Sequence, residues 1–440
     1  MGKIKGSDDM NENQTFGKMT VLGVQHVFAM FGSTILVPLL TGLDPAVALF
    51  CAGIGTLIFH FITGRKVPVF LGSSFAFISA IIAVASMMSN NAEMGTPEYL
   101  IGLRYACGGI ICAGGIYIIL AILVKIFGPD KIRSFFPPLI NGIMIVIIGL
   151  MLAPTAIDNI MKVNGEMITG PALWCNWLIA LVTIMTMLVI SVFAKGFYRM
   201  VPILFGIAVG YVVTVIFHYC GLPVQLNLDP IIQANWFQVP QFFTPLFDIR
   251  AIMIISPLAI VTFVEHLGDI TANSAVVGKD FFQDPGLHRT LLGDGIATMV
   301  AGLIGGPANT TYSENTGVLA ATKNYNPVTL EIAAVFAILI SFIGKFSGFL
   351  QTLPAPVMGG ISIILFGMIA SVGLRILVEG QVDFKDSRNM IIAAIMLVLG
   401  LGGAVFQISE YVSITGVALS AIVGIILNKL VPEQIEKETE

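Results

Sequence analysis

Long apolar segments, separated by short polar or Gly/Pro-containing stretches, make up most of this chain. A helix that crosses a bilayer needs about 20 predominantly apolar residues. Segments of roughly this length recur along the whole sequence, at residues 19–40, 46–63, 67–86, 99–126, 137–153, 172–194, 201–220, 251–270, 290–304, 308–322, 327–347, 356–372, 390–406 and 411–430. The pattern predicts an all-α polytopic membrane protein with about fourteen transmembrane segments. Polar tails are expected at 1–18 and 431–440.

Small polar residues interrupt two of these segments. The third contains Gly72, Ser73 and Ser74, and the tenth opens on the polar run from Asn309 to Glu314. Irregular backbone at membrane depth is tolerated only where it is buried in protein or lines a cavity. In transporters, a pair of such breaks is the usual pointer to the binding site. We therefore expect a binding site where the two breaks lie.

The two breaks occupy matching places in a faint internal repeat. Gln25 and His26 in the first segment match Glu265 and His266 in the eighth, and a break follows each pair after about 45 residues. Seven segments separate the two pairs, so the two halves would insert with opposite topology. This predicts two inverted seven-span repeats, the architecture of many secondary transporters.

Composition and charge agree with a membrane protein. Of 440 residues, 56% are hydrophobic and 11% are charged, whereas soluble proteins average about 25% charged residues. With the N-terminus inside and alternating segments, eighteen of the 22 Lys and Arg residues fall on the inner side. Because inner loops are enriched in Lys and Arg, both termini are expected to be cytoplasmic. The location would be the bacterial cytoplasmic membrane.

Several function classes lose support. The sequence has no Walker A motif, no Gly-x-Gly-x-x-Gly after a strand and no His-Glu-x-x-His pair, which argues against ATP hydrolysis, nicotinamide chemistry and zinc proteolysis. The five cysteines are scattered without Cys-x-x-Cys spacing, so they read as small core residues. No cofactor, metal ion or nucleic-acid partner is expected.

Three carboxylates stand out among the apolar segments. Glu265 and Asp269 are four residues apart, so they share one face of a helix. Two stacked carboxylates in a low-dielectric setting repel each other, and one of them should readily carry a proton. The alternative is a pair at a segment end that merely faces water. Glu314 follows the second break, where free helix N–H groups and a carboxylate would suit a planar ligand with alternating donors and acceptors. Its structural alternative is a glutamate that caps the helix.

Other polar and aromatic groups have more balanced interpretations. Phe75, beside Ser74 in the first break, could stack on a planar ligand, but a phenylalanine in a membrane segment is more often packing. His26 and His266 are more often structural hydrogen-bonding groups than proton carriers. Asp294, early in the ninth segment, is expected to be structural or near the cytoplasmic rim.

The chain also resembles a known family. Residues 314–323, Glu-Asn-Thr-Gly-Val-Leu-Ala-Ala-Thr-Lys, resemble the signature of the nucleobase–ascorbate transporter family, and Gln25 with His26 resembles its first-span Gln-His motif. Residues 71–77 and 284–289 look like those of its uracil-transporting bacterial branch. The similarity covers nearly the whole chain.

The resemblance implies a division into a core and a gate. The core would comprise 19–126 and 251–348, the gate 127–220 and 349–430, and 221–250 an outer loop. Short antiparallel strands in the third and tenth spans would meet at mid-membrane.

The resemblance also implies roles at the site. Glu265 and Glu314 would bind the base, and backbone N–H groups at Phe75 and Ser313 would contact its carbonyl oxygens. Tyr312 belongs to the same substrate-binding set. Asp269 stands where the best-known uracil carrier of the family has a histidine linked to proton coupling, so proton coupling is assigned to Asp269 and Glu265. A supporting polar network would contain Gln25, His26, Ser74 and Asn315.

Three hypotheses follow. The first is a proton-driven uracil importer, surrounded by membrane lipid and working as a homodimer. The second keeps the fold but carries a purine such as xanthine or hypoxanthine, or another nucleobase, with Na⁺ as a possible coupling ion. The third, an intramembrane enzyme or a channel, is disfavoured by the absence of catalytic motifs.

Overall fold

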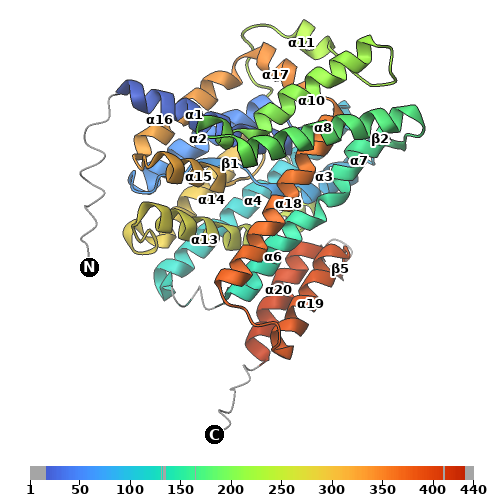
Figure 1. The fold of residues 1–440 in the computed structure, drawn as a ribbon. Coiled ribbons are helices and arrows are strands. Elements are labelled where there is room, and N and C mark those ends of the chain that lie inside the picture. The colour runs from blue at the N-terminus through green and yellow to red at the C-terminus, as the bar shows by residue number, and fades with distance from the viewer. Residues whose placement is uncertain (1–15, 130, 132–134, 164, 410–411, 432–440) are drawn as a thin grey trace.

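The structure is a computed structural model that describes residues 16–129, 131, 135–163, 165–409 and 412–431. Most of the two predicted tails, residues 1–15 and 432–440, lies outside the described residues. Helices dominate the described part of the chain, and three short antiparallel strand pairs accompany them. In Figure 1 the described chain begins with α1 at the left of the view and ends with α20 at the bottom.

The first half of the chain runs from α1 to α11. Its elements are α1 (Phe16–Thr41), α2 (Pro45–Ile62), β1 (Leu71–Ser73), η1 (Phe75–Phe77), α3 (Ile78–Met88), α4 (Pro97–Phe127), α6 (Pro138–Met151), α7 (Ala153–Met161), β2 (Lys162–Val163), β3 (Glu166–Met167), α8 (Pro171–Phe193), α9 (Phe197–Met200), α10 (Pro202–Tyr219) and α11 (Asp229–Gln233).

The second half begins at α12. Its elements are α12 (Ile249–Ile255), α13 (Leu258–Val277), η2 (Phe282–Gly286), α14 (Leu287–Leu303), β4 (Asn309–Thr311), α15 (Ser313–Thr322), α16 (Pro327–Ser341), α17 (Gly344–Gln351), α18 (Ala355–Glu379), α19 (Ser387–Leu401), β5 (Val405–Ser409), β6 (Val412–Thr415) and α20 (Gly416–Leu430). Two helices, a strand, a short helix and a longer helix thus follow one another twice, from α1 to α4 and from α13 to α16.

Local sequence signals explain where several helices begin. Asp44 accepts a hydrogen bond from the Ala46 backbone N–H at 2.8 Å, and Pro45 occupies the first helical position of α2. Asn326 and the proline after it start α16 in the same way. An Asp or Asn cap satisfies one of the free N–H groups of the first turn, and proline there loses no hydrogen bond.

Eight helices in the described part of the chain are long and apolar enough to cross a membrane. Four shorter apolar helices, at Phe75–Met88, Pro327–Ser341, Ser387–Leu401 and Gly416–Leu430, cover further predicted segments. The predicted segment at 137–153 ends in a separate helix, α7, and the segment at 251–270 is divided between α12 and α13. The hairpins β2–β3 and β5–β6 were not predicted. The fourteen-span count therefore stays a prediction.

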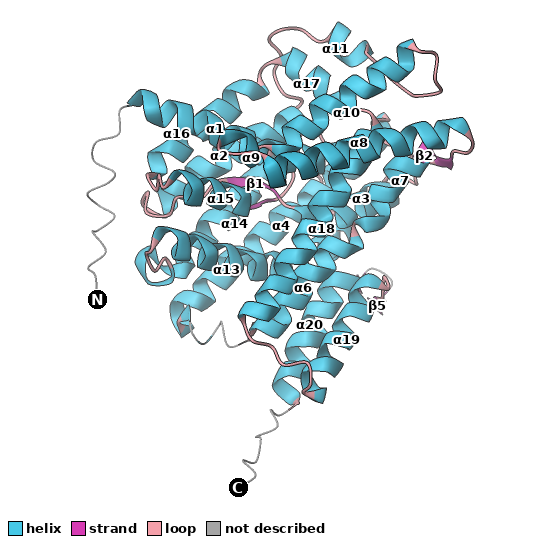
Figure 2. Cartoon of the chain, in the orientation of Figure 1, coloured by secondary structure: helices cyan, strands magenta, loops and turns pink. Residues whose placement is uncertain are grey.

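Two strands meet at the centre of the molecule, as predicted. β1 pairs antiparallel with β4 in the register Leu71↔Thr311, Gly72↔Thr310 and Ser73↔Asn309. Figure 2 shows this pair as short magenta arrows enclosed by helices. All six residues are buried. Each strand satisfies the polar backbone groups of the other, which the bilayer interior requires of any non-helical segment.

Gly72 allows the close packing beside this strand pair. A Cβ atom at Gly72 would collide with the ring of Tyr312 and would lie 2.8 Å from Thr34 Oγ1. The ring and the threonine both come from elements that flank the strands, α1 and the start of α15. Glycine is therefore required at this position by space, since its φ is an ordinary one.

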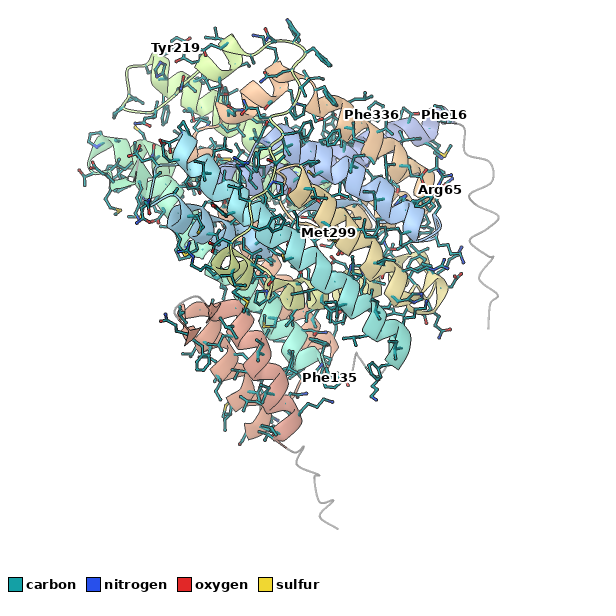
Figure 3. The ribbon with its side chains drawn as sticks, turned by 180° about the vertical axis from the view of Figure 1, so that it is seen from behind. Phe16, Arg65, Phe135, Tyr219, Met299 and Phe336 are labelled. Carbon is teal, nitrogen blue, oxygen red and sulfur yellow. The ribbon has the colours of Figure 1, made fainter. Side chains whose placement is uncertain are left out.

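The strand pair lies between two apolar clusters. One cluster contains Leu71 and the other contains Phe70 and Tyr312. On the far side, α4 and α14 pack closely, and a Cβ atom at Gly114 of α4 would approach the Gly295 oxygen of α14 to 2.7 Å. Figure 3 shows α4 running diagonally across this face, with Met299 of α14 beside it. Close helix packing thus surrounds the short strand pair.

Candidate functional site

A helix begins directly after each strand of the central pair. Ser74 precedes η1 and Tyr312 precedes α15, and both residues have extended backbone angles. No side chain caps either start. The first N–H groups of a helix have no partner within the helix, so uncapped starts can donate to a ligand. Phe75 and Ser313, the predicted donors, are the first residues of these two helices.

Glu314 lies in the first turn of α15 and is half-buried. The Ser33 hydroxyl of α1 donates to its Oε1 atom at 2.7 Å. The bond joins residues 281 positions apart in the chain. It orients the carboxylate and leaves Oε2 for another donor. Ser33 was missed by the sequence analysis, and only its position in the same apolar segment as His26 could have drawn attention to it.

Glu265 and Asp269 lie on α13, which packs against α15 and β4. Both side chains are half-buried. Asp269 Oδ2 accepts a hydrogen bond from Thr311 Oγ1 of β4 at 2.8 Å. Glu265 Oε2 is buried and has no hydrogen-bond partner among the described residues. A buried carboxylate oxygen without a donor is costly, so Glu265 is suited to accept a donor from a ligand or to hold a proton.

Phe75 lies between the strand pair and α18. Its ring is 7% exposed. It contacts Phe366 of α18 edge-to-face, with ring centroids 6.1 Å apart and planes at 80°. This contact connects the first break with a helix of the predicted gate. The stacking role of Phe75 stays a prediction.

The hydroxyl group of Tyr312 is hydrogen-bonded to the strand pair. The hydroxyl donates to the Ser73 backbone oxygen at 2.8 Å, and Thr34 Oγ1 lies 3.5 Å from it. The side chain is 4% exposed. Its polar end therefore ties α15 to β1, and only the ring is left for contact with a ligand.

The predicted supporting network is brought together in part. Asn315 Nδ2 lies 3.1 Å from both the Nδ1 atom and the backbone oxygen of His26, which links α15 to α1. Ser74 Oγ is buried without a hydrogen-bond partner among the described residues. Gln25 donates instead to the Met200 sulfur at 3.0 Å, so its amide nitrogen is directed to α9.

His266 and Asp294 form a contact on the other side of α13. His266 Nδ1 lies 3.1 Å from Asp294 Oδ2, and its Nε2 lies 3.0 Å from Thr290 Oγ1. All three side chains are fully buried. Both ring nitrogens are thus engaged, as a structural histidine would be. Asp294 is fully buried among packed helices.

The site therefore offers both acceptors and donors to a ligand. These are the half-buried carboxylates Glu265, Asp269 and Glu314 and the uncapped starts of two helices, one of which carries Glu314 in its first turn. Within the described residues no group of His, Cys, Asp and Glu has the arrangement of a metal site. Such an arrangement suits a small, uncharged, planar ligand that carries both N–H donors and carbonyl acceptors.

Solved structures show the class of fold. The transmembrane domain of the cyanobacterial bicarbonate transporter BicA superposes with a TM-score of 0.62 at 17% sequence identity, covering 93% of this chain and 96% of that one. Murine Slc26a9, an anion transporter in the inward-facing state, gives a TM-score of 0.68 at 11% identity, covering 96% of this chain and 69% of that one. The fold is that of membrane transporters, and the predicted fold class is confirmed apart from the exact number of spans.

Sequence comparisons show the family. A family model described as Permease family matches residues 17–409, so the chain belongs to this permease family and is an integral membrane transporter, not an enzyme. The chain is 44% identical over 422 residues to a probable uracil permease of Haemophilus influenzae, covering 96% of both chains. It is 44% identical over 430 residues to the uracil permease of Bacillus caldolyticus, covering 96% of this chain and 94% of that one. The uracil permease of Escherichia coli is 36% identical over 428 residues, at 95% and 94% coverage.

Proposed function

We propose that this chain imports uracil across the bacterial cytoplasmic membrane by proton symport. Relatives that match over nearly their whole length are named uracil permeases. The observation that carries the proposal is the half-buried Glu314 at the uncapped start of α15, with one oxygen fixed by Ser33 and the other available. A uracil ring presents two N–H donors and two carbonyl acceptors, which complements the site.

In this proposal each polar group of the ring has a named partner. Glu265 and Glu314 accept the two N–H groups, and the backbone N–H groups of Phe75 and Ser313 donate to the carbonyl oxygens. The rings of Phe75 and Tyr312 cover the faces of the base. Discrimination follows because a base that lacks one of these groups would leave a buried polar partner unpaired.

Proton coupling is proposed for Asp269 and Glu265. The two carboxylates are one helical turn apart on α13, and Asp269 already has a donor in Thr311 while Glu265 Oε2 has none among the described residues. Two negative charges at this spacing in a low-dielectric setting disfavour each other, so a proton on one of them stabilises the unloaded site. Binding of the ring N–H to Glu265 would then displace that proton from Glu265.

The proposed arrangement in the membrane has both termini in the cytoplasm. Residues 19–126 and 251–348 would form the core, 127–220 and 349–430 the gate, and 221–250 an outer loop. The carrier would work as a homodimer surrounded by lipid. Alternating access would move the core, which holds the strand pair, against the gate.

The test is uptake of labelled uracil into proteoliposomes under an inward-directed proton gradient. We expect accumulation that a protonophore abolishes and that a sodium gradient alone does not drive. Uptake driven only by a sodium gradient would show that Na⁺, and not H⁺, is the coupling ion. Competition by xanthine or hypoxanthine at concentrations where uracil fails would favour the second candidate, a purine carrier of the same fold.

Glu314→Gln tests the proposed role of Glu314 in binding uracil. The amide cannot replace a carboxylate that accepts both the Ser33 hydroxyl and a ring N–H, and the loss of one such partner costs about 1–3 kcal/mol. This corresponds to roughly a five- to 150-fold loss in uracil affinity. Glu98→Gln, at the exposed first turn of α4, is the control with the same chemical change. Wild-type affinity in Glu314→Gln would contradict the assigned role.

A further inference from the structure

The His266–Asp294 pair lies directly behind the proposed uracil site. His266 follows Glu265 on α13, and its imidazole bonds to two side chains of α14. His266, Asp294 and Thr290 are all 0% exposed. Uracil coordination does not use any of them, so this buried polar cluster needs its own explanation.

The hydrogen bonds of Thr290 fix the proton on one ring nitrogen. Thr290 Oγ1 lies 3.0 Å from the Leu287 backbone oxygen, which can only accept. The single hydroxyl hydrogen of Thr290 is used there, so His266 Nε2, at 3.0 Å, must donate to Thr290. The contact of 3.1 Å between His266 Nδ1 and Asp294 Oδ2 then needs a hydrogen of its own.

That hydrogen gives the pair one dissociable proton and no net charge. It is either on the ring, as imidazolium beside aspartate, or on the carboxyl group, as neutral imidazole beside aspartic acid. In the alternative, Thr290 donates to Nε2 and the ring Nδ1–H donates to Asp294 Oδ2, which leaves a charged aspartate whose Oδ1 has no partner among the described residues. A net charge with only one donor and no opposite charge is strongly disfavoured in a fully buried setting. The neutral, proton-sharing pair is therefore the favoured state.

The surroundings of the pair are acidic. Titratable groups on α13 itself and on the helices packed against its mid-membrane part are Glu265, Asp269, Tyr117 of α4 and Glu314 of α15. The remaining packed helices α12, α6 and α20 contribute only Arg250 and Lys429, near their ends. Asp294 interacts electrostatically with both Glu265 and Asp269. A change of charge at Glu265 or Asp269 therefore acts on the pair.

We propose that His266 and Asp294 share one proton and form a second proton site of the carrier, coupled to Glu265. The proposal rests on the proposed function and adds a site to it. A uracil N–H that bonds to Glu265 stabilises its charged form. The added negative charge makes the neighbouring pair hold its proton more tightly. Substrate binding therefore makes the pair keep its proton, and a carrier whose pair has lost this proton takes it up again when uracil binds.

The first experiment observes the proton on the wild-type protein. The ¹⁵N spectrum of histidine-labelled carrier distinguishes a protonated ring nitrogen from a bare one. The signal of His266 is assigned with His266→Gln, or by replacing the other histidines one at a time if that variant does not fold. We expect protonated Nε2 at neutral pH and a second hydrogen shared at Nδ1. A bare Nε2 would overturn the proposal.

The second experiment counts protons. Calorimetric titration of uracil in buffers of different ionisation enthalpy gives the number of protons taken up on binding. Asp294→Asn keeps a donor for His266 Nδ1 but cannot carry the proton. We expect this variant to bind uracil and to take up fewer protons than the wild type, by up to about one per carrier. Asp229→Asn, at an exposed position in α11, is the control.

The outcomes separate the two proposals. Equal proton numbers for Asp294→Asn and the wild type at every pH tested refute the second proton site. Absence of uracil binding to the wild type refutes the proposed substrate instead. If Asp294→Asn does not fold, the ¹⁵N spectrum of His266 in the wild type tests the second proton site by itself.

Discussion

Ser33→Ala tests the bond that orients Glu314. The Ser33 hydroxyl is fully buried and donates to Glu314 Oε1 at 2.7 Å, a length typical of hydroxyl–carboxylate bonds. A hydrogen bond to a charged group contributes about 1.5–3 kcal/mol. Glu314 is half-buried, so water can replace part of the lost bond in the variant. We therefore expect the lower end, about 1.5 kcal/mol, which is roughly a tenfold loss of affinity.

The assay is uracil binding to purified carrier, with uptake in proteoliposomes beside it. Loss of the orienting bond should weaken substrate binding more than it slows the transport step, because Glu314 itself is still present. Ser341→Ala is the matched control: Ser341 is equally buried, but its hydroxyl donates to the Ile338 oxygen of its own helix. Uracil affinity of Ser33→Ala within about twofold of the wild type would show that Ser33 does not position the carboxylate.

Three further substitutions test the frame around the site. Gly72→Ala forces a methyl group against the adjacent tyrosine ring and should destabilise the protein by about 1–3 kcal/mol, seen as a lower melting temperature in detergent. Asn315→Asp replaces the amide donor that faces the His26 oxygen with an acceptor. It should destabilise the protein by a similar energy, seen as a lower melting temperature, and should also lower uracil uptake. Glu331→Gln removes a charge that lies 2.9 Å from Arg65, which is 69% exposed, and 3.4 Å from Nδ1 of the buried His60; the Gln oxygen can still accept from both, so stability should fall by about 1 kcal/mol and uptake should persist.

Each of these variants has a comparison that could contradict the reasoning. Gly115→Ala adds the same methyl group within α4 where no atom lies within 4 Å, and it should leave the melting temperature unchanged or raised. Equal effects at both glycines would mean that space at β1 is not limiting. Full uptake in Asn315→Asp would show that the α1–α15 link is dispensable. A large loss in Glu331→Gln would assign that ion pair a role beyond surface packing.

The sequence alone located the main features because each one breaks a local pattern. Glu265, Asp269 and Glu314 are charges in apolar surroundings, and small polar residues mark the two interrupted membrane segments; the strands at these breaks were expected only from the family resemblance. The partners of these groups were not predictable. Ser33 and Glu314 are 281 residues apart, and an isolated serine in an apolar helix carries no signal of its own. Tertiary packing chooses such partners.

Some predicted helix boundaries were wrong for a related reason. Residues 251–270 read as one apolar segment, yet the backbone divides near Pro257 into α12 and α13. An apolar run records burial along its length but not a change in helix direction within it. The hairpin β2–β3 is also short, with only two residues in each strand, which is too few for an alternating pattern to be detected.

The central strand pair has a consequence for synthesis of the protein. The partner of β1 is β4, which lies roughly 240 residues further along the chain. At about 5–20 residues per second, the ribosome needs roughly 10–50 s to reach it. During that time the first half must reside in the membrane with a strand whose hydrogen-bonding edge is open. Neither half can complete its own interior, so assembly has to finish after the second half is inserted. Separately expressed halves should accordingly be degraded alone and rescued by co-expression.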